Sequence, residues 1–392
     1  MEIFWENPGW EQEDRHFKQM KEMPFERSFP FIPEKKGLYV IRGPRQVGKS
    51  SWLKKILSHY AQQGVSSFYL SCETVTHYQE LSEILKSVRN RKVVLLDEVS
   101  FVESWDRAIK SEIDSGKSHI LVVTGSHAHD LKRGADRMPG RFDGGGEFLL
   151  LPMLFAEFEA MRKKAKWHSG NRIEELQAYF RVGGFPTAVA EGGRLGKTPK
   201  KAIQTYWRWL SGDVVQLGKQ EIYLKELLIQ LALCLQTPLS LQTLAKKTGI
   251  GSHNTVQEYV SVLDSCFALR TLYCMDLDTG AHRFRKDKKF YFTDPLLYWM
   301  ALGLSGRSAP DSVEERIAEL VANEELNRRS GRVGYFSNQK GEIDFVSPKQ
   351  WAIEVKWASV IKNVSKAYFE QSFPEKIVWS QENFLAEFPR GF

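Results

Sequence analysis

A glycine-rich loop has the residue types and spacing of a phosphate-binding site. Residues 43–50 read Gly-Pro-Arg-Gln-Val-Gly-Lys-Ser and fit the pattern G-x-x-x-x-G-K-[ST]. Gly43 and Gly48 permit backbone angles and close approaches that a Cβ atom would block. We predict that Lys49 binds the β- and γ-phosphates of a nucleotide and that Ser50 binds Mg²⁺. The other expected nucleotide contacts in the loop are Pro44, Arg45, Gln46, Val47 and Ser51.

Two carboxylates at the end of an apolar run form the second part of the expected site. Residues 93–98 read Val-Val-Leu-Leu-Asp-Glu, and the end of such a strand is where α/β sheets bind ligands. Asp97 is predicted to bind Mg²⁺, and Glu98 is predicted to orient the attacking water. Because hydrolysis needs a group that positions water, the pair favours an ATP hydrolase that uses ATP and Mg²⁺, with Lys49 and Glu98 in catalytic roles.

Hydroxyl groups and one arginine complete the expected site. Residues 120–126 form another apolar run that ends in Thr124 and Ser126, either of which is expected to sense the γ-phosphate. Arg141 is expected to stabilise developing phosphate charge, in its own subunit or in a neighbouring one. An ordinary surface arginine is the alternative interpretation.

The elements that must position these residues follow an α/β pattern. Apolar strands alternate with helical segments, which predicts a parallel sheet covered by helices. The expected strands are 38–41, 67–70, 93–96 and 120–123. An irregular arm, 1–36, is expected before this P-loop core of 37–150, whose last part, 140–146, is expected to be a flexible break. A helical lid or linker, 151–220, is expected after it.

Residues 221–292 predict a winged helix-turn-helix. Three helices, the third over 255–267, precede short strands at 269–274 and 290–292. The loop between the strands is basic, so contact with DNA phosphates through this wing is expected. Protein packing is the alternative role for such a domain. The expected contacts within 283–289 are Arg283, Arg285, Lys286, Lys288 and Lys289.

A second basic stretch spans residues 161–210. It holds eleven Lys or Arg against three Asp or Glu, a net charge of about +8. Such a stretch attracts nucleic acid or another anionic surface. A solvated helical face is the alternative interpretation.

Residues 293–392 are expected to form an α+β domain with a nuclease-like hairpin. With a turn at 348–350, Asp344 lies opposite Glu354, and Lys356 lies on the same face. This arrangement resembles the PD-(D/E)xK nuclease site, in which carboxylates hold Mg²⁺ and the lysine polarises water or phosphate. Glu319, on the preceding helix, is expected to complete the set. The alternatives are an amphipathic hairpin with cross-strand ion pairs and a nuclease-like fold without activity.

Motifs along much of the chain resemble those of AAA-type ATPases of bacteria and archaea that carry a C-terminal domain of unknown function. The resemblance rests first on the phosphate loop and on LLDEV, VVTGS and PGRF, which end at residues 99, 126 and 142. It continues through LLPMLFAEF, GGFP, FYFTD, GEIDF and IEVK, which end at residues 158, 186, 294, 345 and 356. The resemblance implies an ATPase core followed by accessory domains.

Composition sets bounds on the function. The chain has 392 residues and a net charge of +7, and its longest apolar run, Leu296 to Leu304, is too short to span a membrane. Scattered cysteines suit a reducing cytoplasm. We expect a nucleotide-driven switch or remodeller, with DNA as a candidate place of action and a protein partner or a second copy of the chain as a further candidate. The rival hypotheses are an ATP-regulated, metal-dependent DNA nuclease and a non-enzymatic ATP-binding adaptor.

Overall fold

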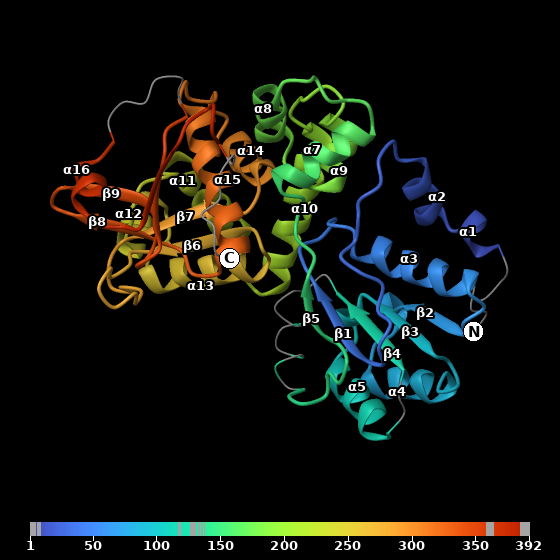
Figure 1. Ribbon diagram of the computed structural model, residues 1–392. Coiled ribbons are helices and arrows are strands. Elements are labelled where there is room, and N and C mark those ends of the chain that lie inside the picture. The colour runs from blue at the N-terminus through green and yellow to red at the C-terminus, as the bar shows by residue number, and fades with distance from the viewer. Residues whose placement is uncertain are drawn as a thin grey trace. The chain divides into compact units, whose positions relative to one another are not determined.

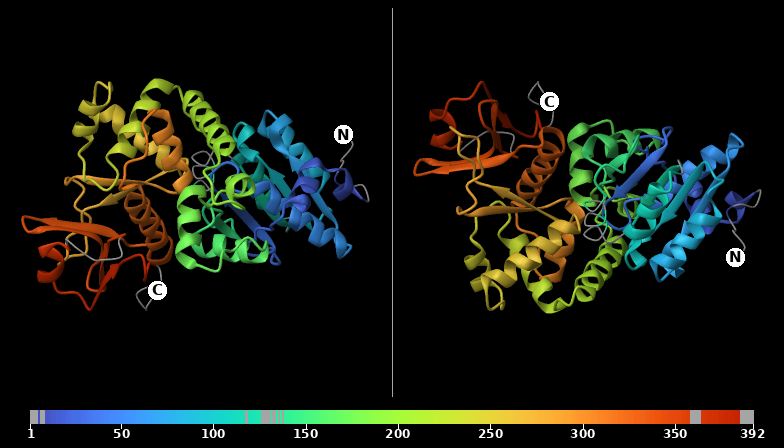
Figure 2. Two further views of the ribbon diagram at one scale, coloured as in Figure 1. Left: turned by 90° about the horizontal axis from the view of Figure 1, so that it is seen from above. Right: turned by 90° about the horizontal axis from the view of Figure 1, so that it is seen from below.

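The computed structural model divides into two compact units, Met1–Pro152 and Met153–Phe392 (Figures 1 and 2). The structure describes residues 5, 9–116, 119–125, 131, 134, 136, 138–357 and 364–384.

A parallel sheet organises the N-terminal unit. Its strand order is β2-β3-β4-β1-β5, and every neighbouring pair is parallel. The four predicted strands are confirmed. The fifth, β5, was missed because its segment is short and rich in glycine, which predicted a break. The bounds are β1 Gly37–Arg42, β2 Ser67–Ser71, β3 Val93–Asp97, β4 Ile120–Thr124 and β5 Gly146–Leu149.

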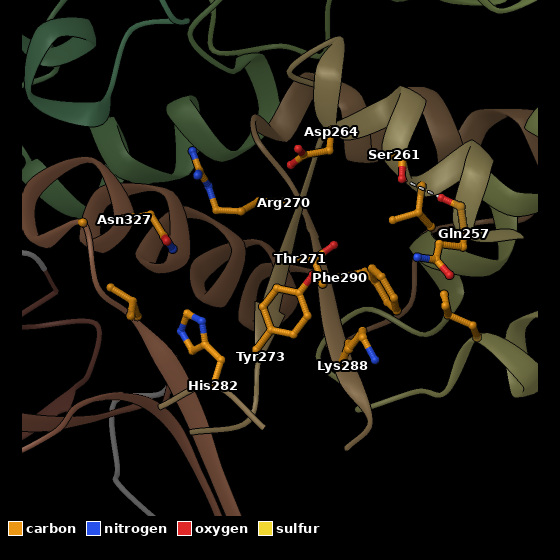
Figure 3. Close-up of a pocket in the computed structure, with 14 residues that line it drawn as sticks. Gln257, Ser261, Asp264, Arg270, Thr271, Tyr273, His282, Lys288, Phe290 and Asn327 are labelled. Atoms are coloured by element: carbon orange, nitrogen blue, oxygen red, sulfur yellow. Dashed lines mark hydrogen bonds between the residues drawn. The ribbon is translucent and has the colours of Figure 1, made fainter. Parts of the chain in front are cut away.

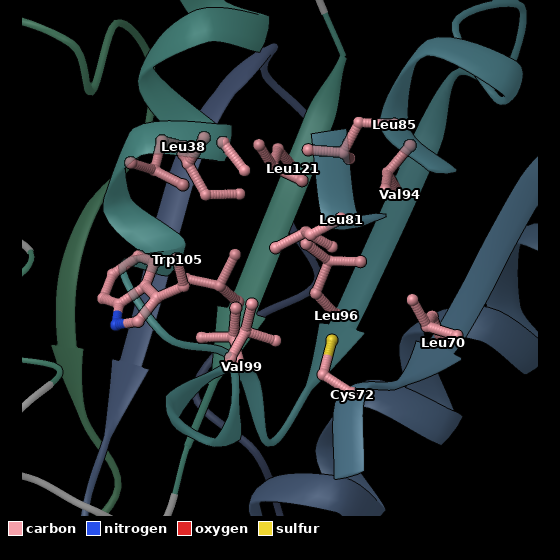
Figure 4. Packing of buried hydrophobic residues seen from close by; sticks show 14 of the residues in the cluster. Leu38, Leu70, Cys72, Leu81, Leu85, Val94, Leu96, Val99, Trp105 and Leu121 are labelled. Atoms are coloured by element: carbon pink, nitrogen blue, oxygen red, sulfur yellow. The ribbon is translucent and has the colours of Figure 1, made fainter. Parts of the chain in front are cut away.

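Helices cover both faces of this sheet, as the apolar strands predicted. Helix α3, Lys49–Gln62, packs on one face through Trp52 and its neighbours. Helices α4, Tyr78–Ser87, and α5, Trp105–Asp114, cover the other face. Figure 4 shows Leu81 near Leu96 and Leu85 near Leu121, and Trp105 belongs to the same buried cluster. Burial on both faces removes apolar surface from water, and each Å² of that surface stabilises the fold by about 25 cal/mol. Short 3₁₀ turns at Cys72–Thr74 and Val99–Phe101 follow β2 and β3.

The N-terminal arm is more ordered than the sequence predicted. It forms α1, Trp10–Glu13, and α2, Arg15–Glu22. Asp14 caps α2 by accepting from the amide of Phe17 at 2.6 Å, and it also pairs with buried Lys54 of α3 at 2.7 Å. The prolines of this segment predicted an irregular arm, and the pairing of Asp14 with Lys54 could not be foreseen because Lys54 lies 40 positions away.

The C-terminal unit begins with helices, as expected from the pattern of apolar residues. Residues 183–185 separate α8 from α9. The helices of this part are α7 Phe155–Lys164, α8 Arg172–Val182, α9 Pro186–Gly192, α10 Lys200–Gln216, α11 Glu221–Leu233, α12 Leu241–Lys247 and α13 His253–Ser265.

An antiparallel hairpin follows α13. Its strands are β6, Leu269–Tyr273, and β7, Lys288–Phe292, and the main chain of Leu239 also pairs with Lys288. Helices α14, Pro295–Leu304, and α15, Val313–Ser330, come next. None of the described helices combines the length and the apolar character that a membrane span requires.

A mixed sheet completes the unit, with strand order β11-β10-β9-β8. Ile353 of β10 pairs with Phe345 of β9, which is the register from which Glu354 was predicted to lie opposite Asp344. A short helix, α16, Lys366–Glu370, precedes the last strand. The strands are β8 Gly334–Asn338, β9 Gly341–Ser347, β10 Trp351–Val355 and β11 Glu375–Trp379.

Candidate nucleotide-binding site

The phosphate loop connects β1 to α3 and folds around its own lysine. The ammonium of Lys49 donates to the carbonyl oxygens of Gly43 at 3.0 Å and Pro44 at 2.8 Å, and the side chain is buried. A Cβ atom on Gly43 would lie 1.9 Å from the carbonyl oxygen of Leu150, and Gly48 has φ of 101°. Both positions therefore require glycine. The cation and the N-terminus of α3 fit a phosphate chain.

Asp97 is held rigidly at the end of β3. Its Oδ1 accepts from the Thr124 hydroxyl at 2.5 Å, and its Oδ2 accepts from the Tyr69 hydroxyl at 2.7 Å. Burial, and then the nearby Asp97 carboxylate, raise the pKa of Tyr69 well above its usual value, so the phenol stays a donor. Asp97 and Ser50 supply the oxygen ligands that Mg²⁺ prefers, so both residues fit the cation.

Glu98 follows in an uncommon backbone conformation. Its φ is 54°, in the left-handed region, and its amide donates to Thr124 Oγ1 at 3.3 Å. A non-glycine residue in this region costs about 1 kcal/mol or more and is frequent at functional sites. Thr124 therefore contacts both members of the acidic pair. Ser126, the other predicted γ-phosphate sensor, lies outside the described residues.

Strand order brings these groups to one edge of the sheet. β4 lies between β1 and β3, with Ile41 of β1 beside Thr124 and Leu96 of β3 beside Val123. Because carboxyl ends of parallel strands share an edge, the phosphate loop, Thr124 and the acidic pair open toward the same side. The geometry matches a nucleotide with its cation.

The arm supports the phosphate loop from outside. Arg27 Nη1 donates to the carbonyl oxygen of Val47 at 2.6 Å, and its Nη2 donates to that of Leu151. The ring of Phe29 lies near Gly48 and stacks on Trp52 with centroids 5.7 Å apart. Ser51 shares a hydrogen bond of 3.3 Å with His16. No sequence motif marked Arg27, because its partners are main-chain carbonyls.

Arg141 lies at the opposite edge of the sheet. It forms a two-point ion pair with Asp114, at 2.8 and 3.1 Å, where α5 ends. The carbonyl of the adjacent Phe142 accepts from the amide of Leu38, at the beginning of β1. The phosphate loop follows the other end of β1, so this structure does not bring Arg141 to the phosphates of its own chain. The side chain is partly exposed.

The loop of the β6–β7 hairpin has a smaller cationic surface than its sequence predicted. Lys289 is 1% exposed, so it is corrected from a surface contact to an interior residue. Arg283 pairs with Asp276 at 2.5 Å. The hydrogen bond from the Thr279 amide and the Arg283 pair lower the pKa of Asp276. Arg285 and Lys286 are exposed, as is the ring of Phe284.

The other basic stretch, residues 161–210, also contains an interior cation. Arg162 is buried and pairs with Glu175 at 2.5 Å. Burial raises the pKa of Glu175, but its hydrogen bonds, chiefly from Arg162, lower it below its usual value overall. Lys163 and Lys164 are exposed, so part of this stretch stays available to an anionic surface.

A pocket of about 380 Å³ lies between α13 and the β6–β7 hairpin. Figure 3 shows Gln257, Ser261 and Asp264 of α13 facing hairpin residues that include Arg270 and Lys288. The lining carries both acidic and basic groups. It therefore lacks the uniformly basic character that favours phosphate binding.

Two of the motifs noted in the sequence meet inside the C-terminal unit. Buried Asp294 accepts from the amides of Gly184 and Leu296, each at 2.8 Å. Desolvation by burial raises the pKa of Asp294 to about 7, against the opposing effect of these hydrogen bonds. The carboxyl thus joins the GGFP segment to the first turn of α14.

The predicted nuclease residues lie near one another but are bonded to protein groups. Val355 donates its amide to Asp344 Oδ2 at 3.0 Å, and Gln236 donates to Glu319 Oε2 at 2.7 Å. Lys356 pairs with Glu354 at 3.3 Å. Asp344 and Glu354 are buried. Among described residues, no group of three or more His, Cys, Asp or Glu is arranged to hold a metal ion.

Residues 35–159 match the family model of an AAA domain. Residues 173–308 match the model of a domain of unknown function (DUF8612). An uncharacterized protein of Haemophilus influenzae is 26% identical over 331 residues, which cover 79% of each chain. The uncharacterized protein MJ1544 of Methanocaldococcus jannaschii is 28% identical over 167 residues, covering 40% of this chain and 36% of the relative.

Solved structures show similarity at low sequence identity. The Walker-type ATPase of Pyrococcus abyssi is 15% identical with a TM-score of 0.46, and the match covers 74% of this chain and 95% of that one. The ORC2 protein of Aeropyrum pernix is 12% identical with a TM-score of 0.37, covering 73% of this chain and 89% of that one.

Proposed function

We propose that the N-terminal unit binds ATP with Mg²⁺ and hydrolyses it, acting as a nucleotide-driven switch or remodeller. The observation that carries this proposal is the convergence of the Lys49 loop, Thr124 and the acidic pair at one sheet edge. The match of residues 35–159 to an AAA domain supports it.

Each residue has a chemical role in this proposal. Lys49 exchanges its loop carbonyls for phosphate oxygens and neutralises charge on the transferred group. Ser50 and Asp97 hold Mg²⁺, which supplies further charge stabilisation when bound. Glu98 orients the attacking water, and Thr124 keeps Asp97 and Glu98 in register. The ion pair of Arg141 at the far edge favours a structural role, or a role at a neighbouring subunit's site, over action on its own chain's nucleotide.

Replacement of Lys49 tests the proposal. Lys49→Ala should weaken ATP binding at least about 100-fold, because a charged contact to phosphate contributes about 3 kcal/mol. Equilibrium titration of the full chain with a fluorescent ATP analogue measures the affinity. Lys86→Ala, at an exposed lysine of α4, is the matched control and should bind as wild type does. Equal affinity in the Lys49 variant would show that the nucleotide binds elsewhere.

DNA contact through a winged helix is a second proposed activity. Three helices, a main-chain bridge at Leu239 and the β6–β7 hairpin support this assignment. The specific observation that favours DNA is the hairpin loop, where the exposed cations Arg285 and Lys286 adjoin the exposed ring of Phe284. Cations neutralise the backbone, and an aromatic ring can stack on bases. Binding of DNA by variants of this loop tests the assignment.

A further inference from the structure

Buried Lys289 lies at the centre of three carboxylates. Its Nζ is 2.6 Å from Glu342 Oε1, 3.1 Å from Glu319 Oε1 and 3.3 Å from Asp344 Oδ1. The lysine comes from β7, Glu319 from α15, and the other two from β9. We call Lys289, Glu319, Glu342 and Asp344 the lysine–carboxylate cluster.

Further contacts fix Glu319 and Asp344, two of the three carboxylates that the nuclease resemblance assigned to the site. Glu319 also accepts from the hydroxyl of Tyr291 and from Gln236. Asp344 uses its second oxygen for the amide of Val355. Buried carboxylates need a counter-charge and hydrogen-bond donors, and this chain supplies both. The residues therefore do not fit the Mg²⁺ that a PD-(D/E)xK site would use.

We infer that Lys289 is a built-in cation that replaces the metal of a nuclease-like site, so that the C-terminal sheet is a structural module rather than a nuclease. The ammonium ion supplies positive charge to the carboxylates from within the fold. A divalent cation would have to displace a buried lysine, which would then be left without its acidic partners.

The lysine–carboxylate cluster also fixes the β6–β7 hairpin to the sheet. β7 provides Lys289 and Tyr291, while β9 and α15 provide the acids. Two further hydrogen bonds reinforce this attachment. The amide of Met275 donates to the carbonyl oxygen of Tyr335 at 2.8 Å, and the hydroxyl of Tyr335 donates to the carbonyl oxygen of Asp287 at 2.6 Å. The site that a nuclease would use for chemistry here holds the hairpin in place.

Mn²⁺ binding to the full chain, measured by calorimetry without nucleotide, tests the inference. Wild type and Asp344→Asn should give the same binding isotherm, because the cluster takes up no Mn²⁺. Neither protein should cut single- or double-stranded DNA with Mg²⁺ or Mn²⁺. A Mn²⁺ site or a cleavage activity that wild type has and Asp344→Asn lacks would overturn the inference.

Removal of the lysine charge tests the same inference from the other side. Lys289→Met should lower the Tm by about 10 °C, since breaking a buried ion pair leaves unbalanced charge. Added Mn²⁺ should raise the Tm of this variant more than that of wild type. Lys289→Arg keeps the charge and should lose less stability. A Lys289→Met protein as stable as wild type would contradict the role of the cation. If Lys289→Met does not fold, the wild-type comparison with Asp344→Asn still decides.

Discussion

At the scale of single residues, the hydroxyl of Thr124 links the parts of the candidate ATP site. It donates to Asp97 and accepts from the amide of Glu98. The two acids thus keep a fixed relation even though they have different proposed tasks, one toward the cation and one toward water. Such fixed positions lower the cost of reorganisation during the reaction.

Glu98 should matter for turnover and not for binding. Glu98→Gln keeps the shape of the side chain but removes the carboxylate that orients water. We expect ATP hydrolysis to fall about 100-fold or more, while the affinity for ATP changes little. A coupled phosphate-release assay and an equilibrium titration measure the two quantities. A variant that turns over ATP at the wild-type rate would remove Glu98 from the mechanism.

The residues of this candidate site could be proposed from the sequence because their signals are local, and the structure brings Thr124 into contact with Asp97 and Glu98. An apolar run that ends in two acids, or a pair of glycines at fixed spacing, can be recognised from neighbouring residues alone. Tyr69 and Arg27 were not predicted, because each acts through a group far away in the sequence: the Asp97 carboxylate for one and the Val47 carbonyl for the other. Lys289 was assigned to the surface for the same reason.

At the scale of elements, a buried carboxyl joins a loop to a helix. Asp294 caps α14 and holds the amide of Gly184. A Cβ atom on Gly183 would lie 2.1 Å from Asp294 Oδ1, so only glycine fits where the loop passes the start of α14. Neither motif showed this contact in the sequence, since 110 positions separate Gly184 and Asp294.

This joint should make stability depend on pH. The pKa of Asp294 rises from 3.8 to about 7 on folding, so the folded protein binds more protons than the unfolded chain between these values. Stability from this group is therefore lost as pH rises from about 4 to about 7. Asp294→Asn does not titrate. The free-energy advantage of wild type over the variant should decrease by about 3 kcal/mol from pH 5 to pH 8.

Urea unfolding of both full-length proteins at pH 5 and pH 8 measures this difference. Asparagine offers one oxygen in place of two, so one amide also loses its acceptor, at a cost of about 1–3 kcal/mol at every pH. That constant cost does not affect the comparison across pH. If the difference in unfolding free energy between the two proteins is the same at pH 5 and pH 8, Asp294 is not the group whose titration changes stability.

At the scale of the whole molecule, the positive charge is distributed unevenly between surface and interior. The net charge is +7, yet Lys289 and Arg162 are buried with acidic partners. Counting basic residues along the sequence therefore overestimates the surface that DNA could contact. The exposed cations of the β6–β7 loop indicate that surface more reliably than the count does.

Removal of Arg285 and Lys286 should weaken binding to DNA and reduce its dependence on salt. If both contact phosphates, the slope of log affinity against log salt should become shallower by about two in their alanine variant. Fluorescence anisotropy at several salt concentrations measures this. The matched control replaces Lys163 and Lys164, exposed lysines of α7. A loss of DNA affinity in the control variant alone would assign the DNA contact to residues 161–210. ATP affinity should be unchanged in both variants.

The position of β1 has a consequence for the order in which the chain folds. β1 lies in the interior of its sheet, yet its neighbours β4 and β5 come from much later in the sequence. During synthesis, the buried residues Leu38 to Ile41 have no strand partner until Ile120–Thr124 has emerged. Pairings between distant segments form slowly, and an apolar strand with open edges is prone to aggregate. A chain that stops before β4 should therefore be insoluble, while a chain that includes β5 can complete the sheet.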